Sequence, residues 1–127
     1  MNFQENKPIF QQLADRICDD ILLGKYCDHD RIPSVREYAA TVEVNANTVM
    51  RTYDLLQNLD IIYNRRGIGY FISPDAKKKI YKMKQESYLN DEIEYFFRQL
   101  LTLGIDSDKL ANLYKEYCNN HKNFKKK

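Results

Sequence analysis

The chain has 127 residues, of which 43% are hydrophobic and 30% are charged. The length suits one domain of ordinary size or one very small domain with an appendage, and the composition supports a packed core and excludes a chain that is disordered throughout. The formal net charge is only +2, and no run of 18 apolar residues occurs, so we expect no membrane span and no membrane partner.

Residues 8–23 are predicted to form the first helix. Apolar residues recur at steps of three and four, which places them on one helix face: Ile9, Leu13, Ile17, Ile21 and Leu22. Pro8 suits the first turn, where its missing N–H costs nothing, and Gly24 suits the position just beyond the last turn.

Residues 34–41 and 45–58 are predicted to form two further helices separated by a short turn. Ser34 and Glu37 have the spacing of a capping box, in which each side chain binds the backbone N–H of the other residue. Asn45 is a residue type that favours the N-cap of the third helix. Two helices joined in this way, the second with a polar amino end, indicate a helix-turn-helix.

Residues 61–64 and 70–72 are β-branched and aromatic, and they predict the two strands of a β-hairpin. The connecting turn, Arg65–Gly69, contains two arginines and two glycines. Three helices followed by a hairpin predict a winged helix-turn-helix over residues 1–73. The fold class is therefore mostly α with a small β-hairpin, followed by a helical tail.

Residues 74–127 are expected to form a two-helix dimerisation tail. The first helix is predicted to start with Ser73 as its N-cap and to end at Leu103, with a bend near residues 87–90 as an alternative. The second is predicted to begin near residue 107 and to end at about Asn119. The alternative to a dimer is that the aromatic side chains fill a monomeric core, but two helices cannot bury this much apolar surface on each other alone. The residues expected at the dimer contact are Tyr88, Leu89, Ile93, Phe96, Phe97, Leu100 and Tyr114.

The charge is distributed unevenly along the chain. Residues 1–73 carry 8 Lys and Arg against 10 Asp and Glu, whereas residues 74–127 carry 12 against 8. DNA would therefore have to meet a local basic surface. A helix amino end fits the major groove, and glycines at a hairpin tip allow close approach to the minor groove. The residues expected to face DNA are Ser34, Arg36, Asn45, Asn47, Thr48, Arg51, Arg65, Arg66, Gly67 and Gly69.

Several of these residues have simpler alternative roles. Ser34 and Glu37 can act only as helix caps, and Arg36 can pair with Glu37 or Glu43. A turn with two glycines is also common. Since residues 1–73 are net acidic, the alternative function is a winged helix that binds another protein without specific DNA binding.

The sequence gives no support for a metal, a cofactor or catalysis. Cys27-x-His29 and Cys118-x-x-His121 could supply metal ligands, but nothing in the sequence brings the two pairs together. No glycine-rich phosphate motif and no catalytic Ser/His/Asp arrangement occurs. We therefore expect no enzyme, no cofactor, no metal and no disulfide. The amino end also lacks the pattern of a secretory signal, so we expect a cytoplasmic protein.

The motifs together resemble the DNA-binding domain of the GntR family of bacterial transcription regulators. The resemblance covers about residues 7–73 and rests on the following motifs: Pro8-Ile9-Phe10-x-Gln12, Pro33-Ser34-x-Arg36-Glu37, Val44-Asn45-x-Asn47-Thr48-Val49, Arg51-x-Tyr53-x-x-Leu56 and Arg65-x-Gly67-x-Gly69-x-Phe71. It implies a winged helix-turn-helix that binds double-stranded operator DNA as a homodimer. It also implies that Arg36, the turn into the third helix and the wing tip face the DNA.

The short tail is similar to that of the YtrA-type subfamily, because 54 residues after Ser73 leave no room for a large effector domain. That similarity implies a dimeric transcriptional repressor, often of a transporter operon, that binds a palindromic operator. The chain departs from the common pattern at Ala46, where Pro is frequent, and at residues 59–61. The sequence leaves open the operator, a small-molecule effector and the choice between activator and repressor.

Overall fold

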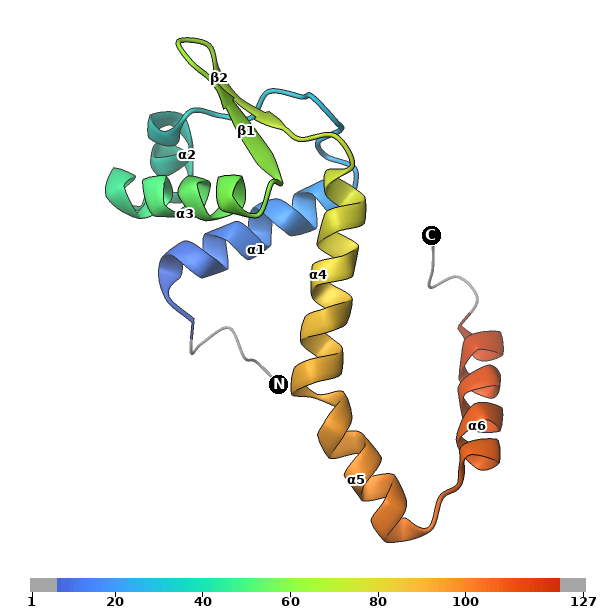
Figure 1. Cartoon of the computed structure of the whole chain (residues 1–127). Helices are drawn as coiled ribbons and strands as arrows, with labels where there is room; N and C mark the ends of the chain where they lie inside the picture. The colour runs from blue at the N-terminus through green and yellow to red at the C-terminus, as the bar shows by residue number, and fades with distance from the viewer. Residues whose placement is uncertain (1–6, 122–127) are drawn as a thin grey trace. The chain divides into compact units, whose positions relative to one another are not determined.

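The computed structural model describes residues 7–121. The chain forms two compact units, and the boundary between them in the sequence lies between Lys84 and Gln85. The described part contains six helices and one two-stranded sheet (Figure 1). The elements in chain order are α1 Ile9–Leu22, α2 Val35–Val42, α3 Ala46–Asn58, β1 Ile62–Arg65, β2 Gly69–Ile72, α4 Ala76–Asp91, α5 Ile93–Leu103 and α6 Ser107–Asn120. No helix among the described residues is long and apolar enough to cross a membrane.

Helix α1 confirms the expected first helix, and its apolar face is confirmed at Leu13, Ile17 and Ile21, whereas Ile9 is 52% exposed and Leu22 is half-buried. The side chains that it buries in the core of the first unit are Leu13, Ala14, Ile17, Cys18 and Ile21. Gly24 follows the helix with a φ of +88°, a left-handed conformation that costs glycine little. Pro8 occupies the N-cap position, one residue before the first turn in which it was expected.

Helices α2 and α3 form the expected helix-turn-helix. The capping box at α2 is complete, because Glu37 N–H donates to Ser34 Oγ at 3.1 Å and Ser34 N–H donates to Glu37 Oε1 at 2.9 Å. Glu43 ends α2 in the left-handed conformation, with a φ of 57°. The fully buried Thr52 on α3 donates to the backbone oxygen of Phe10 at 2.8 Å, which ties α3 to α1.

The hairpin pairs β1 with β2 in an antiparallel register that runs from Ile62 opposite Ile72 to Arg65 opposite Gly69. The sequence analysis did not predict that a third segment, ahead of α2, pairs along the free edge of β2. Ile32 N–H donates to Tyr70 O at 3.0 Å, and Arg31 forms an isolated antiparallel bridge with Phe71. The sheet of the wing therefore has a third, very short strand-like edge.

Helix α4 begins at Ala76, so the expectation that Ser73 is its N-cap is wrong. Asp75 adopts a φ of +63°, and its N–H donates to Asp28 Oδ2 at 3.1 Å, which delays the helix. Ala76 and Ile80 are fully buried in the core of the first unit. The first unit therefore extends beyond residue 73, and the start of α4 belongs to it.

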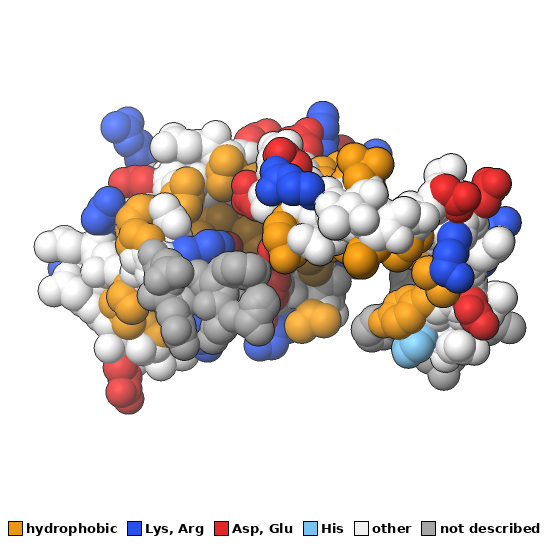
Figure 2. Space-filling view, turned by 90° about the horizontal axis from the view of Figure 1, so that it is seen from below, with side chains coloured by type: hydrophobic (Ala, Val, Ile, Leu, Met, Phe, Trp, Pro, Cys, Tyr) orange, Lys and Arg blue, Asp and Glu red, His pale blue; other side chains and the backbone are white. Residues whose placement is uncertain are grey.

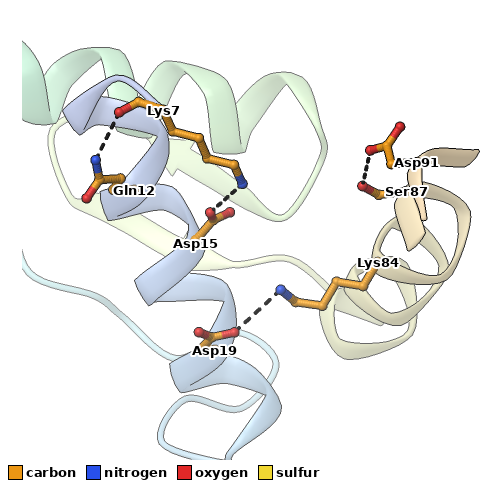
Figure 3. A network of polar contacts seen from close by, with 7 residues as sticks. All are labelled: Lys7, Gln12, Asp15, Asp19, Lys84, Ser87 and Asp91. Carbon is orange, nitrogen blue, oxygen red and sulfur yellow. Dashed lines mark hydrogen bonds and ion pairs between the residues drawn. The ribbon is translucent and has the colours of Figure 1, made fainter. Parts of the chain in front are cut away.

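The continuous helix expected up to Leu103 is interrupted, so the part after residue 73 contains three helices and not two. Helix α4 ends at Asp91, and α5 begins at Ile93 after Glu92, whose φ is −116°. The interruption lies just beyond the residues 87–90 considered for a bend. Asn90 and Asp91 are residue types of low helix propensity, because their side chains can compete for backbone hydrogen bonds. Ser87 Oγ lies 3.3 Å from Asp91 Oδ2, one turn before the interruption (Figure 3).

The second unit contains no fully buried side chain among residues 85–121. Helix α5 ends at Gly104, which has a φ of +72°, and Asp106 caps α6 by accepting from Lys109 N–H at 2.9 Å. The half-buried apolar residues in this unit are Ile93, Leu100, Ile105 and Leu110. In the space-filling view, hydrophobic side chains reach the surface of the molecule between charged ones (Figure 2).

Candidate nucleic-acid interface

Helix α2, the amino end of α3 and the tip of the hairpin lie on one side of the first unit (Figure 1). Arg36 stands in the first turn of α2 and is exposed. Within residues 7–121 it forms no ion pair, so the alternative pairing with Glu37 or Glu43 is not observed. The Ser34 hydroxyl, in contrast, is used as a helix cap. Arg36 therefore offers a free guanidinium at this surface, and Ser34 fixes the helix that carries it.

The amino end of α3 carries three of the expected DNA-facing residues. Asn45 acts as the N-cap, because its Oδ1 accepts from Asn47 N–H at 2.7 Å. The side chain of Asn47 is exposed and Thr48 is half-buried. Asn47 is thus the polar side chain in this turn that remains free to meet a base edge, among the residues described.

Arg51 has a partner that the sequence analysis did not foresee. Its Cζ atom lies 4.1 Å from the centre of the Phe10 ring at the start of α1. At this distance the guanidinium is attracted by the face of the ring. Arg51 therefore joins α3 to α1, in addition to any contact that it makes with DNA.

The hairpin tip presents Arg65, Arg66 and Gly67 to solvent, whereas Gly69 is half-buried. Gly67 has a φ of +75° and Gly69 a φ of +146°, values that favour glycine. A side chain at Gly67 would meet nothing within 4 Å, whereas a Cβ at Gly69 would lie 2.8 Å from Arg31 Nε. Glycine is therefore favoured at both positions by the backbone conformation, and at Gly69 it also leaves room for the Arg31 side chain.

Arg31 is an exposed arginine beside the wing that sequence reasoning missed. Its neighbour Gly69 lies far away in sequence, and no local pattern indicates that the two residues meet. The one available signal was its position just before the Pro33-Ser34 motif.

The buried tyrosines of the first unit hold the helix-turn-helix and the wing together. The rings of Tyr53 and Tyr70 meet edge to face at 4.9 Å, and Tyr38 lies 6.2 Å from Tyr53. Burial is the main cause that raises the pKa of all three hydroxyls. The three hydroxyls therefore stay protonated near pH 7, and that of Tyr53 donates a hydrogen bond to the backbone oxygen of Pro33.

The three cysteines are free thiols, and Cys18 alone among them is buried. Among residues 7–121, no group of three His, Cys, Asp or Glu side chains is placed to hold a metal ion. His29 Nδ1 lies 2.9 Å from the Tyr63 hydroxyl. Burial raises the pKa of the Cys18 thiol to about 11, so this cysteine is a poor nucleophile.

The residues expected at a dimer contact lie in the second unit and at the end of α4, and most are exposed in the single chain. Phe96 is 43% exposed and Phe97 49%, and their rings lie 6.2 Å apart. Ile93 and Leu100 are half-buried. Large apolar residues that the expectation omitted are also exposed, namely Tyr95, Leu101, Leu103, Leu113 and Tyr117. The single chain thus leaves a large apolar surface uncovered.

Comparison with known proteins identifies the fold and the class of regulator. The family of bacterial regulatory proteins named gntR matches residues 9–72. The chain belongs to the GntR family. It is 34% identical over 115 residues to the transcriptional regulator YhcF of Bacillus subtilis, covering 91% of this chain and 93% of YhcF. The helix-turn-helix repressor YtrA of the same organism is 29% identical over 97% of this chain and 94% of its own.

A crystal structure of a GntR-family regulator from Bacteroides thetaiotaomicron extends the similarity to the tail. It is 51% identical, covers 89% of this chain and 98% of its own, and superposes with a TM-score of 0.79. The chain is thus a DNA-binding helix-turn-helix transcriptional regulator and not an enzyme. Its near full-length similarity to YtrA places it with the short-tailed members of the family.

Proposed function

We propose that the protein is a transcriptional repressor that binds a palindromic operator as a homodimer. The proposal rests on a set of exposed polar side chains on one side of the first unit that have no partner among the described residues. Arg36, Asn47 and Arg66 are exposed there and have no hydrogen-bond or ion-pair partner within residues 7–121. A major groove admits the amino end of α3, and the hairpin tip is of a size to follow into the adjacent minor groove.

The acidic residues of the first unit are compatible with DNA binding because several are paired away from these side chains. On α1, Asp15 lies 2.8 Å from Lys7 Nζ, and Asp19 lies 3.5 Å from Lys84 Nζ (Figure 3). Asp60, at the end of α3, lies 2.7 Å from Lys79 Nζ. Three of the acidic side chains are therefore each paired with a lysine, while Arg36, Arg51 and the arginines of the wing supply cations at the candidate interface.

The dimer contact is proposed to consist of the exposed apolar side chains within residues 85–121. These helices have no buried core of their own, and a second copy could cover Tyr88, Phe96 and Tyr114. A dimer with two-fold symmetry presents two copies of α3 to DNA, which is the reason to expect a palindrome.

Repression is supported by the similarity to YtrA, which is described as a repressor. Members of the YtrA-type subfamily often regulate transporter operons, and we extend this role to the present chain. The described residues 7–121 contain no large domain beyond the three helices after the hairpin, so any effector would have to bind without one.

Selection of bound DNA from a random pool tests the operator and the dimer together. We expect two half-sites related by two-fold symmetry, with their centres about 34–36 Å apart or a multiple of that spacing. Sedimentation of the complex should give two chains per site. A selected site without two-fold symmetry would overturn the palindromic operator. The absence of any selected sequence would favour the protein-binding alternative.

A further inference from the structure

Arg31 lies beside the wing, and residues far from it in sequence hold it there. The segment that leads into α2 runs past the hairpin (Figure 1). There Arg31 bridges to Phe71 of β2, and Ile72 N–H donates to Asp30 O at 2.9 Å. Arg31 is therefore held at the edge of the sheet by backbone pairing, and its side chain starts from a fixed position.

The register of the sheet places Arg31 and Arg65 on the same face. Residues directly opposite each other in an antiparallel pair point to the same side, and so do residues two apart along a strand. Arg31 is opposite Phe71, Phe71 is two residues from Gly69, and Gly69 is opposite Arg65. This is the face turned away from the core, because the alternate residues Ile62 and Ile72 are buried.

Gly69 leaves the space that the Arg31 guanidinium occupies. A Cβ atom at Gly69 would lie 2.8 Å from Arg31 Nε, 3.3 Å from Nη2 and 3.4 Å from Cζ. On the other side of Gly69, Arg65 Cζ lies 5.8 Å from the centre of the Phe71 ring, and that ring stacks on Tyr63 at 5.6 Å. The Arg31 guanidinium thus lies against Gly69, and the Arg65 guanidinium lies near the Phe71 ring on the same outer face of the sheet.

The Arg31 guanidinium has no hydrogen-bond or ion-pair partner within residues 7–121, although it is exposed. It lies three residues before Ser34, the N-cap of α2, and beside the wing. A planar group with five N–H donors in this place suits the oxygens of a phosphate. It is thus in contact with the wing and close in the chain to α2, the two elements that the proposed function assigns to DNA.

We propose that Arg31 is a further DNA-contacting residue, which binds a backbone phosphate between the amino end of α2 and the wing. Gly69 is its positioning residue, because a Cβ atom there would lie 2.8 Å from Arg31 Nε and would displace the guanidinium from this place. This inference rests on the proposed DNA-binding function and adds a contact to it.

The test compares Arg31→Ala with Arg31→Lys and with a matched control, Arg16→Ala, which removes one exposed cation from α1. Each is titrated against the selected operator and scrambled DNA at several salt concentrations. One phosphate contact contributes about 0.9 to the salt slope, or about fivefold in affinity at 0.15 M salt. A dimer that loses two contacts should bind both DNAs about thirtyfold more weakly, with the slope flatter by about two. Arg31→Lys should retain part of this affinity, and Arg16→Ala all of it.

Gly69→Ala tests the positioning role through a double-mutant cycle. Alone it should weaken binding in the same direction as Arg31→Ala, and much of this effect should disappear when Arg31 is already Ala. Backbone strain at the φ of +146° acts in both backgrounds and therefore cancels in the cycle.

Thermal unfolding of each variant separates this role from a structural one. If Arg31→Ala lowers the unfolding temperature and leaves the DNA affinity and salt slope unchanged, Arg31 only supports the wing and the proposal is overturned. A wild-type protein that binds no DNA would instead overturn the proposed function itself, and the role of Arg31 with it.

Discussion

The hydroxyl group of Tyr53 donates a 2.7 Å hydrogen bond to the backbone oxygen of Pro33. Tyr53 belongs to α3 and is fully buried, whereas Pro33 immediately precedes the N-cap of α2. The ring of Tyr53 also meets Tyr70 of β2 edge to face. One side chain therefore connects the two helices of the helix-turn-helix with the wing, and it fixes the relative positions of the elements that carry the candidate interface.

Tyr53→Phe is expected to lower the free energy of unfolding by about 1–2 kcal/mol, because it removes the donor and leaves a partly buried carbonyl group unpaired. Urea denaturation measures the change. Tyr81→Phe is the control, since Tyr81 is 47% exposed and the substitution should change stability by less than about 0.5 kcal/mol. Equal denaturation midpoints for the two variants would show that the Tyr53 hydroxyl contributes nothing.

The double substitution Phe96→Asp with Leu100→Asp is expected to give monomers. It places two charges in the apolar surface that a second copy would have to desolvate. Sedimentation equilibrium at tens of micromolar measures the mass, and the operator affinity should fall in parallel. Gln99→Asp with Thr102→Asp adds the same charge at exposed polar positions of α5 and should remain dimeric. A wild-type protein that sediments as a monomer would rule out this surface as a dimer contact.

Elements specified by short-range signals could be predicted from the sequence. The Ser34–Glu37 capping box, the Asn45 cap and the glycine after α1 each depend on residues within a few positions, and the structure contains all three. The hairpin was also predictable, because its strands and its turn are continuous in sequence.

Features that depend on distant contacts could not be predicted. Ser73-Pro74 is a good local start for a helix, but the contact between Asp75 and Asp28 delays α4 until Ala76. The interruption at Glu92 contains neither proline nor glycine and so carries no strong local signal. For the candidate interface, the residue types were evident, whereas the partners of Arg51 and Arg31 come from other elements and change what each arginine does.

Arg51→Ala is expected to lower the free energy of unfolding by about 0.5–1 kcal/mol, because it removes the cation–π contact with Phe10. Arg36→Ala is the matched control, since Arg36 has no partner within the described residues and its loss should leave stability nearly unchanged. Chemical denaturation of both variants in the absence of DNA provides the comparison. Identical stability of the two would indicate that the Phe10 contact has no energetic role.

The ion pair between Lys79 and Asp60 should make part of the stability depend on pH. A hydrogen bond from Lys79, together with its charge, lowers the pKa of the Asp60 carboxyl group. A lowered pKa in the folded state stabilises the protein above the ordinary carboxyl value, near pH 4, and this stabilisation is lost as the pH falls through the folded value. Lys79→Met should therefore reduce the loss of stability between pH 7 and pH 3.

Urea denaturation of Lys79→Met at both pH values measures this difference. Lys78→Met is the control, because Lys78 is exposed and forms no ion pair within residues 7–121. If both variants lose the same stability on acidification, the Lys79 contact does not stabilise the ionised form of Asp60.

Replacement of Arg36 is expected to change DNA binding differently from replacement of the wing arginines. Arg36 stands in the first turn of a helix whose capping box is complete, so its stem is held and its guanidinium can make a bidentate contact with guanine. Arg36→Ala should then cost about 1–3 kcal/mol on the cognate site and relax the preference at one base pair in each half-site. On scrambled DNA the loss should be much smaller.

Arg65 and Arg66 stand at the exposed hairpin tip, so they are more suited to phosphates or to the narrow minor groove. Their replacement by Ala should weaken binding to cognate and scrambled DNA by a similar factor and flatten the salt slope by about one for each lost contact. With about three phosphate contacts in each subunit, the wild-type dimer should show a slope of roughly −5. Binding isotherms at several salt concentrations, with circular dichroism as the folding control, distinguish the two roles. If Arg36→Ala loses the same factor on both DNAs, Arg36 binds a phosphate and does not read a base, because a lost base contact must weaken the cognate site more than the scrambled one.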